Sequence, residues 1–120
     1  MDDLYFFPLR QFRRRKIRRV ASGAASENID DVGVASGYFN KVVRLAVENA
    51  THNFTSFRFG VWDGSTFHPL GEQTSPLLGV LYWTVDPFYL SDDQRLRIVL
   101  VGCTASDVVN VYIDEFYKEV

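Results

Sequence analysis

The sequence predicts an all-β protein, an antiparallel β-sandwich or small barrel of jelly-roll-like or immunoglobulin-like kind, and the jelly-roll-like sandwich is the fold that we expect. Three observations support this class. The 120 residues include ten Phe, six Tyr and two Trp, a composition that favours sheets. Segments of alternating polar and apolar residues follow one another at short spacing, with turn residues between them. From Tyr38 onward no long helical pattern interrupts these segments, which argues against a parallel sheet.

Six segments of the body carry strand patterns. In residues 39–48 every second side chain is apolar, and only Lys41 interrupts the face that would be buried. Residues 54–62 and 95–101 alternate in the same way, and residues 77–85 are largely apolar. The predicted strands are residues 39–48, 54–62, 65–70, 77–85, 95–101 and 108–116.

Turn residues separate these predicted strands. Asp63-Gly64 is the strongest hairpin signal in the chain and joins the second strand to the third. Residues 71–76, GEQTSP, form the next turn. Asp86-Pro87 ends the fourth strand and begins a loop that runs to Gln94, and residues 102–107 turn the chain into its last strand.

Positive charge is concentrated near the N-terminus. Residues 10–19 contain seven of the thirteen Lys and Arg residues: Arg10, Arg13, Arg14, Arg15, Lys16, Arg18 and Arg19. Residues 1–19 carry seven positive and two negative charges, a net of +5, while residues 20–120 carry six positive and thirteen negative charges, a net of −7. Such a run seeks phosphate, anionic lipid or an acidic protein surface, so these seven residues are predicted to bind a capsid protein or nucleic acid.

The N-terminal part is predicted to be a basic arm and linker, residues 1–37, ahead of a β-sandwich body, residues 38–120. Residues 8–20 fit a short amphipathic helix, or else a tail that orders only on contact. Residues 21–37 are small, polar and rich in glycine, which is typical of a linker or an extended arm. The arm or linker could also add one or two strands. A free arm implies that removing residues 1–19 leaves the body folded.

No motif supports catalysis, a metal or another cofactor, and we expect a protein without enzymatic activity. His52, His68 and Cys103 lack the local signature of a nucleophile with its base, and are interpreted as surface histidines and a core thiol. The acid pairs at residues 30–31 and 92–93 are interpreted as turn residues rather than as calcium or acid–base sites.

Four aromatic residues are candidates for a subunit interface: Trp62, Tyr82, Trp83 and Tyr89. Tyr82 and Trp83 are consecutive, so a strand would place one of them facing outward. An outward aromatic residue can belong to a subunit interface, where Tyr and Trp are enriched, or to a platform on which a ligand stacks.

Residues 90–117, LSDDQRLRIVLVGCTASDVVNVYIDEFY, carry a resemblance. Their strand–turn–strand pattern rests on Leu90, Asp93, Leu96, Ile98, Leu100 and Gly102, then Val109, Val111, Tyr112, Ile113 and Asp114. It resembles that of small jelly-roll or β-sandwich proteins of virus particles, including the decoration (cement) proteins of tailed phages. The resemblance implies a structural protein, trimeric or otherwise symmetric, whose N-terminal arm reaches onto neighbouring capsid subunits. Small icosahedral virus coats are also similar, but a shell-forming jelly roll usually has eight strands, more than the six predicted.

We therefore expect a non-enzymatic structural protein of a virus or phage particle, a capsid decoration or minor capsid component anchored by its basic arm. It would contact a capsid or other virion protein, form a homo-oligomer with a trimer favoured, and be made in the host cytoplasm before it enters the virion. The alternatives are a nucleic-acid-binding module that uses the arm, and a carbohydrate- or ligand-binding β-sandwich built on Trp62, Trp83 and Tyr89. No membrane partner is expected.

Overall fold

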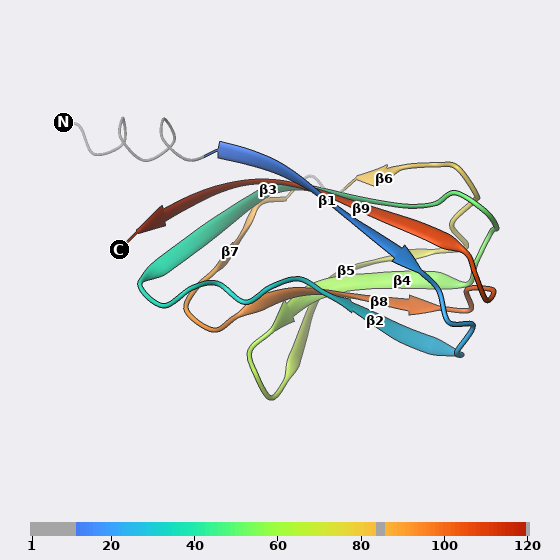
Figure 1. Cartoon of the computed structure of the whole chain (residues 1–120), viewed down its shortest axis with the longest axis horizontal. Coiled ribbons are helices and arrows are strands. Elements are labelled where there is room, and N and C mark those ends of the chain that lie inside the picture. The colour runs from blue at the N-terminus through green and yellow to red at the C-terminus, as the bar shows by residue number, and fades with distance from the viewer. Residues whose placement is uncertain (1–11, 84–85, 120) are drawn as a thin grey trace.

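Every regular element of the described residues is a β-strand. The computed structural model describes residues 12–83 and 86–119. Its strands are β1 (Phe12–Val20), β2 (Ser26–Asp30), β3 (Tyr38–Asn49), β4 (Ser56–Trp62), β5 (Phe67–Thr74), β6 (Tyr82–Trp83), β7 (Phe88–Leu90), β8 (Arg95–Val101) and β9 (Val108–Glu119). They form two antiparallel sheets packed against each other, so the predicted all-β sandwich is confirmed (Figure 1).

The strand order is that of a jelly roll. Sheet A runs β1–β9–β3–β6, with β7 also paired to β3, and sheet B runs β2–β8–β4–β5. Because β6 and β7 both pair with β3, these two short strands share one position at the edge of sheet A. Each sheet then offers four positions, and together they fill the eight of a jelly roll.

The core lies between the two sheets and takes side chains from both. Leu45 on β3 and Ile113 on β9 come from sheet A, while Ile98 and Leu100 on β8 come from sheet B. All four are at most 1% exposed. Burying a side chain of this size stabilises the folded state by about 1.5–3 kcal/mol, so this layer is the main source of stability.

The basic run is an edge strand of the sandwich, and the predicted helix is wrong for residues 12–20. β1 pairs with β9 along its whole length, from Phe12 opposite Phe116 to Val20 opposite Val108. Exposed and partly buried residues alternate along β1 one by one, which is the period of a strand. Most arginines of this strand form ion pairs with carboxylates of the same chain. These ion pairs favour a strand, although the spacing of the few apolar residues suits a helix. Arg10 lies outside the described residues.

The predicted linker also contributes to the sheets. Ser26–Asp30 forms β2, the edge of sheet B, and pairs with β8. Residues 12–37 are therefore part of the sandwich, and residue 37 does not end a separate arm. The two additional strands considered for the arm and linker both exist. A jelly roll has eight strand positions, and these two strands add the two positions that the six predicted strands lacked.

A β-bulge in β3 explains the anomalous position of Lys41. The register between β3 and β9 shifts between Val42 and Arg44, so Val43 is the extra residue. Before the bulge Asn40 and Val42 face the core, and after it Leu45 and Val47 do. The simple alternation placed Lys41 on the buried face. The bulge turns it to the outer side of sheet A, together with Arg44.

The largest remaining differences from the predicted strands concern β5, β6 and β7. The hairpin at Asp63-Gly64 is confirmed, with Gly64 at a positive φ of 102°, but its second strand is Phe67–Thr74 and includes part of the predicted turn. Of residues 77–85, only Tyr82–Trp83 is described as strand. Phe88–Leu90, which was predicted as loop, pairs with β3 instead.

Candidate binding face on sheet A

The outer side of sheet A carries rows of aromatic and basic side chains. Residues directly opposite each other on neighbouring antiparallel strands project from the same side of a sheet. The register therefore defines four rows from β1 across β9 and β3 to the edge: Phe12–Phe116–Lys41–Tyr89, Arg14–Asp114–Arg44, Lys16–Tyr112–Ala46–Trp83, and Arg18–Asn110–Glu48. We call this set of residues the basic-aromatic face.

Two arginines from different strands share one buried carboxylate in this face. Arg14 on β1 binds Asp114 through Nε–Oδ1 at 2.6 Å and Nη2–Oδ2 at 2.9 Å, and Arg44 on β3 reaches the same Oδ2 at 2.9 Å. The carboxylate side chain is 2% exposed, while the two arginine side chains are 60% and 53% exposed. The hydrogen bond from Arg14, with that from Arg44, holds the pKa of Asp114 below its ordinary value although burial opposes this shift. This row presents a net charge of +1 to solvent.

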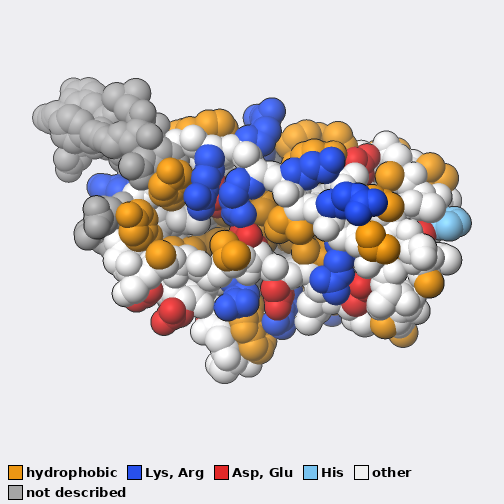
Figure 2. All heavy atoms as spheres, viewed as in Figure 1, with side chains coloured by type: hydrophobic (Ala, Val, Ile, Leu, Met, Phe, Trp, Pro, Cys, Tyr) orange, Lys and Arg blue, Asp and Glu red, His pale blue; other side chains and the backbone are white. Residues whose placement is uncertain are grey.

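Cations and aromatic rings lie together within these rows and between neighbouring ones. Three cationic groups lie over rings of a neighbouring strand: Lys16 Nζ 5.5 Å from the Tyr112 centroid, Lys41 Nζ 5.8 Å from Tyr89, and Arg44 Cζ 5.4 Å from Trp83. Trp83 and Tyr89 still keep 48% and 59% of their surface exposed. Figure 2 shows Lys and Arg side chains along the course of β1, with hydrophobic side chains between them. Exposed Trp, Tyr and Arg are the residue types that interface centres favour.

The other arginines of β1 point between the sheets, where they neutralise buried carboxylates. Arg15 binds Glu115 at 2.8 Å and Asp31 at 2.6 Å, and Arg13 binds the same Glu115 oxygen at 2.5 Å. Glu115 is fully buried and Asp31 is 8% exposed. A buried carboxylate that loses its partner destabilises a fold by about 3–5 kcal/mol. These arginines are therefore structural.

The inward arginines also line a hollow of about 390 Å³ beside Asp31 and Tyr38. Two guanidinium groups in a hollow would suit an anion. Here, however, Arg13 and Arg15 already meet the carboxylates of Asp31 and Glu115, so the local charges cancel. We therefore do not assign an anion site to this hollow.

Only part of the basic run is left to meet a partner. Arg13, Arg14, Arg15 and Arg19 all have a carboxylate of the same chain within ion-pair distance, the last at 3.4 Å from Glu27. Within the described residues, Lys16 and Arg18 have none. The acidic surface that the sequence suggested on another copy is thus largely supplied by the chain itself.

The four predicted interface aromatics do not gather in one place. Trp83 and Tyr89 lie on the basic-aromatic face. Tyr82 faces inward, packs against the core, and accepts a hydrogen bond from the Leu77 amide at 2.8 Å. Trp62 lies on sheet B beneath the guanidinium of Arg97, 4.0 Å from its ring centroid. A single platform that combines Trp62 with Trp83 and Tyr89 is therefore incompatible with this fold.

Several residues of the face were missed in the sequence. Lys41 and Arg44 were not selected as site residues, and Tyr112 entered only through the resemblance. A signal was present for Lys41, because a lysine on an otherwise apolar strand face is unusual. The β-bulge at Val43 explains this position. No such signal existed for the rows that join β1 to β9 and β3, since the pairing of distant strands is not visible in local patterns.

Asn49 and Asp107 link His52 to Cys103 at one end of the sandwich, whereas no local sequence motif related these residues. His52 Nδ1 contacts Asp107 Oδ1, and Asn49 Nδ2 donates to the other Asp107 oxygen at 2.9 Å and lies 3.9 Å from Cys103 Sγ. Burial, followed by the charges of Asp107 and Glu27, raises the pKa of the Cys103 thiol to about 11. A protonated, buried thiol is a poor nucleophile. The hydrogen bonds to Asp107 from Asn49, His52 and the Thr104 amide tie the loops at this end together.

The described residues contain no group of three or more His, Cys, Asp or Glu side chains arranged to hold a metal ion. They also contain no helix of the length and apolarity needed to cross a membrane. No family model matches this sequence, and no curated protein matches it.

Proposed function

We propose that this protein is a non-enzymatic structural component of a virus particle that associates with neighbouring subunits through the basic-aromatic face. One observation carries the proposal. Two exposed aromatic side chains, Trp83 and Tyr89, lie in register with cations on the same side of sheet A. Covering large exposed aromatic groups of this kind with a partner makes the free energy of association more favourable.

The charges favour a protein partner over nucleic acid. Lys16, Arg18 and Lys41 are the cations of this face without a described carboxylate within ion-pair distance. Three phosphate contacts would give a slope of about −2 for log affinity against log salt on single strands, compared with about −5 for seven. The whole chain also carries a net charge of −2, whereas nucleic-acid-binding domains are usually strongly basic. A weakly positive aromatic face is better suited to an acidic protein surface.

The partner that we propose is a second copy of the chain in a symmetric trimer. The jelly-roll connectivity and the resemblance of residues 90–117 to virion proteins support this by analogy. The exposed carboxylates of Asp92 and Asp93 take no part in the ion pairs of the basic run, so another copy still offers charges of the complementary sign. A cyclic oligomer allows each copy to present its face to the next.

Mass measurement by light scattering tests the proposal. The natural chain should have three times its single-chain mass of 13.8 kDa. Replacing both Trp83 and Tyr89 with Ala should return it to the single-chain mass. Arg58→Ala changes an exposed residue of sheet B and serves as the matched control that should remain oligomeric.

A second measurement distinguishes the nucleic-acid alternative. Fluorescence anisotropy of a labelled oligo-dT strand should show little binding at physiological salt. Tight binding that the double variant Lys16→Ala/Arg18→Ala abolishes, together with a single-chain mass for the natural protein, would contradict the proposal and favour a nucleic-acid-binding module.

A further inference from the structure

An aromatic cleft opens at the edge of the sandwich opposite β1. It lies between the β4–β5 hairpin of sheet B and the short strands β6 and β7 of sheet A, and has a volume of about 460 Å³. Sites for small molecules are commonly of about 300–1,000 Å³. The cleft is therefore large enough for a small organic ligand.

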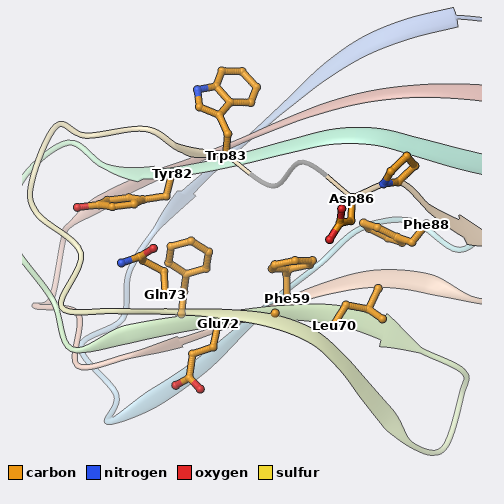
Figure 3. A pocket seen from close by; sticks show the side chains of 11 residues that line it. Phe59, Leu70, Glu72, Gln73, Tyr82, Trp83, Asp86 and Phe88 are labelled. Atoms are coloured by element: carbon orange, nitrogen blue, oxygen red, sulfur yellow. The ribbon is translucent and has the colours of Figure 1, made fainter.

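Four rings form the apolar part of this cleft. The centroids of Phe59 and Phe88 are 6.1 Å apart, and those of Phe57 and Tyr82 are 6.3 Å apart. In Figure 3 the ring of Phe59 lies between Tyr82 and Phe88, while the Trp83 side chain points away from the gap that they border. A ligand that enters the cleft would meet ring faces and edges from both sheets.

The cleft exists because few side chains fill this edge. Gly71 on β5 lies opposite Phe59, and a Cβ at this position would collide with the Phe59 ring. On the other side, sheet A ends in the short strands β6 and β7 rather than in one continuous strand. The two sheets therefore do not close over Phe59.

The charge of the cleft is uniformly negative. Asp86 and Glu72 are its two charged lining residues among those described, and no Lys, Arg or His lines it. Figure 3 shows the Asp86 carboxylate directed toward Phe59 and the Glu72 side chain directed away from the cleft. Within the described residues, the Asp86 carboxylate has no hydrogen bond or ion pair to the protein.

We propose that this cleft binds a small organic cation, an amine or quaternary ammonium that carries an apolar or aromatic group. The cation would pair with Asp86, and the apolar group would contact Phe59, Phe88 and Tyr82. Ammonium groups are attracted to the faces of aromatic rings, and a carboxylate at the rim adds a charge of the required sign. An anionic ligand would meet only repulsion. This inference does not rest on the proposed assembly face. Trp83 borders both, but the rings of Phe59, Phe88 and Tyr82 are not part of that face, and the Trp83 side chain points away from the gap that they border (Figure 3).

Three probes of similar shape and different charge test the proposal: phenethylamine, 2-phenylethanol and 3-phenylpropionate. Titrations of the full chain, followed by protein NMR, should show saturable shifts with phenethylamine. Its affinity should exceed that of the neutral alcohol by about tenfold, in the range of a cation–π contact assisted by a carboxylate. The anion should not bind.

Matched variants identify the groups responsible. Asp86→Asn should reduce the affinity for the amine to that for the alcohol, while Glu72→Gln, which removes the acid that points away, should leave it unchanged. Phe88→Leu should weaken both probes. Equal affinities for amine and alcohol in the natural chain, or no saturable shift with the amine, would overturn the proposal. So would saturable binding of a neutral monosaccharide such as glucose in the absence of amine binding, which would indicate a sugar site.

Discussion

The guanidinium of Arg15 lies 2.8 Å from the carboxylate of Glu115, which is fully buried and 100 residues away in the sequence. This ion pair joins the basic run to the strand that closes the jelly roll. The run is consequently a structural edge strand, and its outward residues become part of a continuous sheet face. Inward-pointing charges and exposed cations on an edge strand also oppose edge-to-edge aggregation.

Removing residues 1–19 should abolish cooperative folding. The truncation deletes nearly all of β1 and leaves Glu115 and Asp114 buried without their β1 arginines, each loss being destabilising by several kcal/mol. Thermal unfolding followed by circular dichroism checks this. A sharp transition like that of the full chain would instead show that the run is a dispensable arm.

Stability should fall in acid because two buried carboxylates have lowered pKa values. For Asp114 the Arg14 hydrogen bond lowers it; for Asp107 burial raises it, but hydrogen bonds from Asn49 and His52 outweigh this effect. Their folded pKa values lie below the unfolded value of about 3.9, so their contribution is complete above that value and is lost as pH falls through the folded values. Urea unfolding from pH 7 to pH 2 measures the loss. Asp107→Asn should reduce the decrease in unfolding free energy between pH 7 and pH 2. An equal decrease in both proteins would contradict the lowered pKa of Asp107.

Gly60 should tolerate no side chain. It lies at the register shift between β4 and β5, and a Cβ there would overlap the His68 carbonyl oxygen and lie 2.8 Å from Pro69 Cα. Backbone atoms cannot move aside cheaply, so Gly60→Ala should lower the unfolding free energy by about 1–3 kcal/mol. Gly33→Ala is the matched control, because the nearest atom to its Cβ would be at 3.6 Å. Similar stability of the two variants in urea would argue against the close approach at Gly60.

Cys103 should react slowly in the folded protein. Its thiol has a pKa of about 11 and is 6% exposed, so about one molecule in a thousand carries the thiolate at pH 8. Ellman's reagent should label it slowly in buffer and rapidly in urea. Rapid labelling in buffer would mean that this end of the sandwich opens readily.

The class of fold could be predicted because the alternation of polar and apolar residues in a strand is visible in a short stretch of sequence. Residues 95–101 show it clearly: Leu96, Ile98 and Leu100 face the core as expected. The hairpin at Asp63-Gly64 was equally predictable, because its turn depends on a glycine with positive φ. These features need no knowledge of distant strands.

The basic run was mispredicted because its partners are distant. Local spacing allowed a helix, and only the carboxylates of Asp31 and Glu115 make a strand with inward arginines favourable. The basic-aromatic face was not predicted for the same reason. It depends on the registers of β1, β9 and β3 and on the bulge at Val43, none of which a single strand reveals.

An alanine scan along β1, read out by urea unfolding, tests most directly that the basic run is an integral strand. Arg15→Ala should lower the unfolding free energy by about 3–5 kcal/mol, because it leaves Glu115 and Asp31 without a main partner. Lys16→Ala and Arg18→Ala, on the outer side, should stay within about 0.5 kcal/mol of the natural protein. This alternation with a period of two residues would confirm the strand. Small and equal effects at all three positions would contradict the integral strand and would favour a free arm.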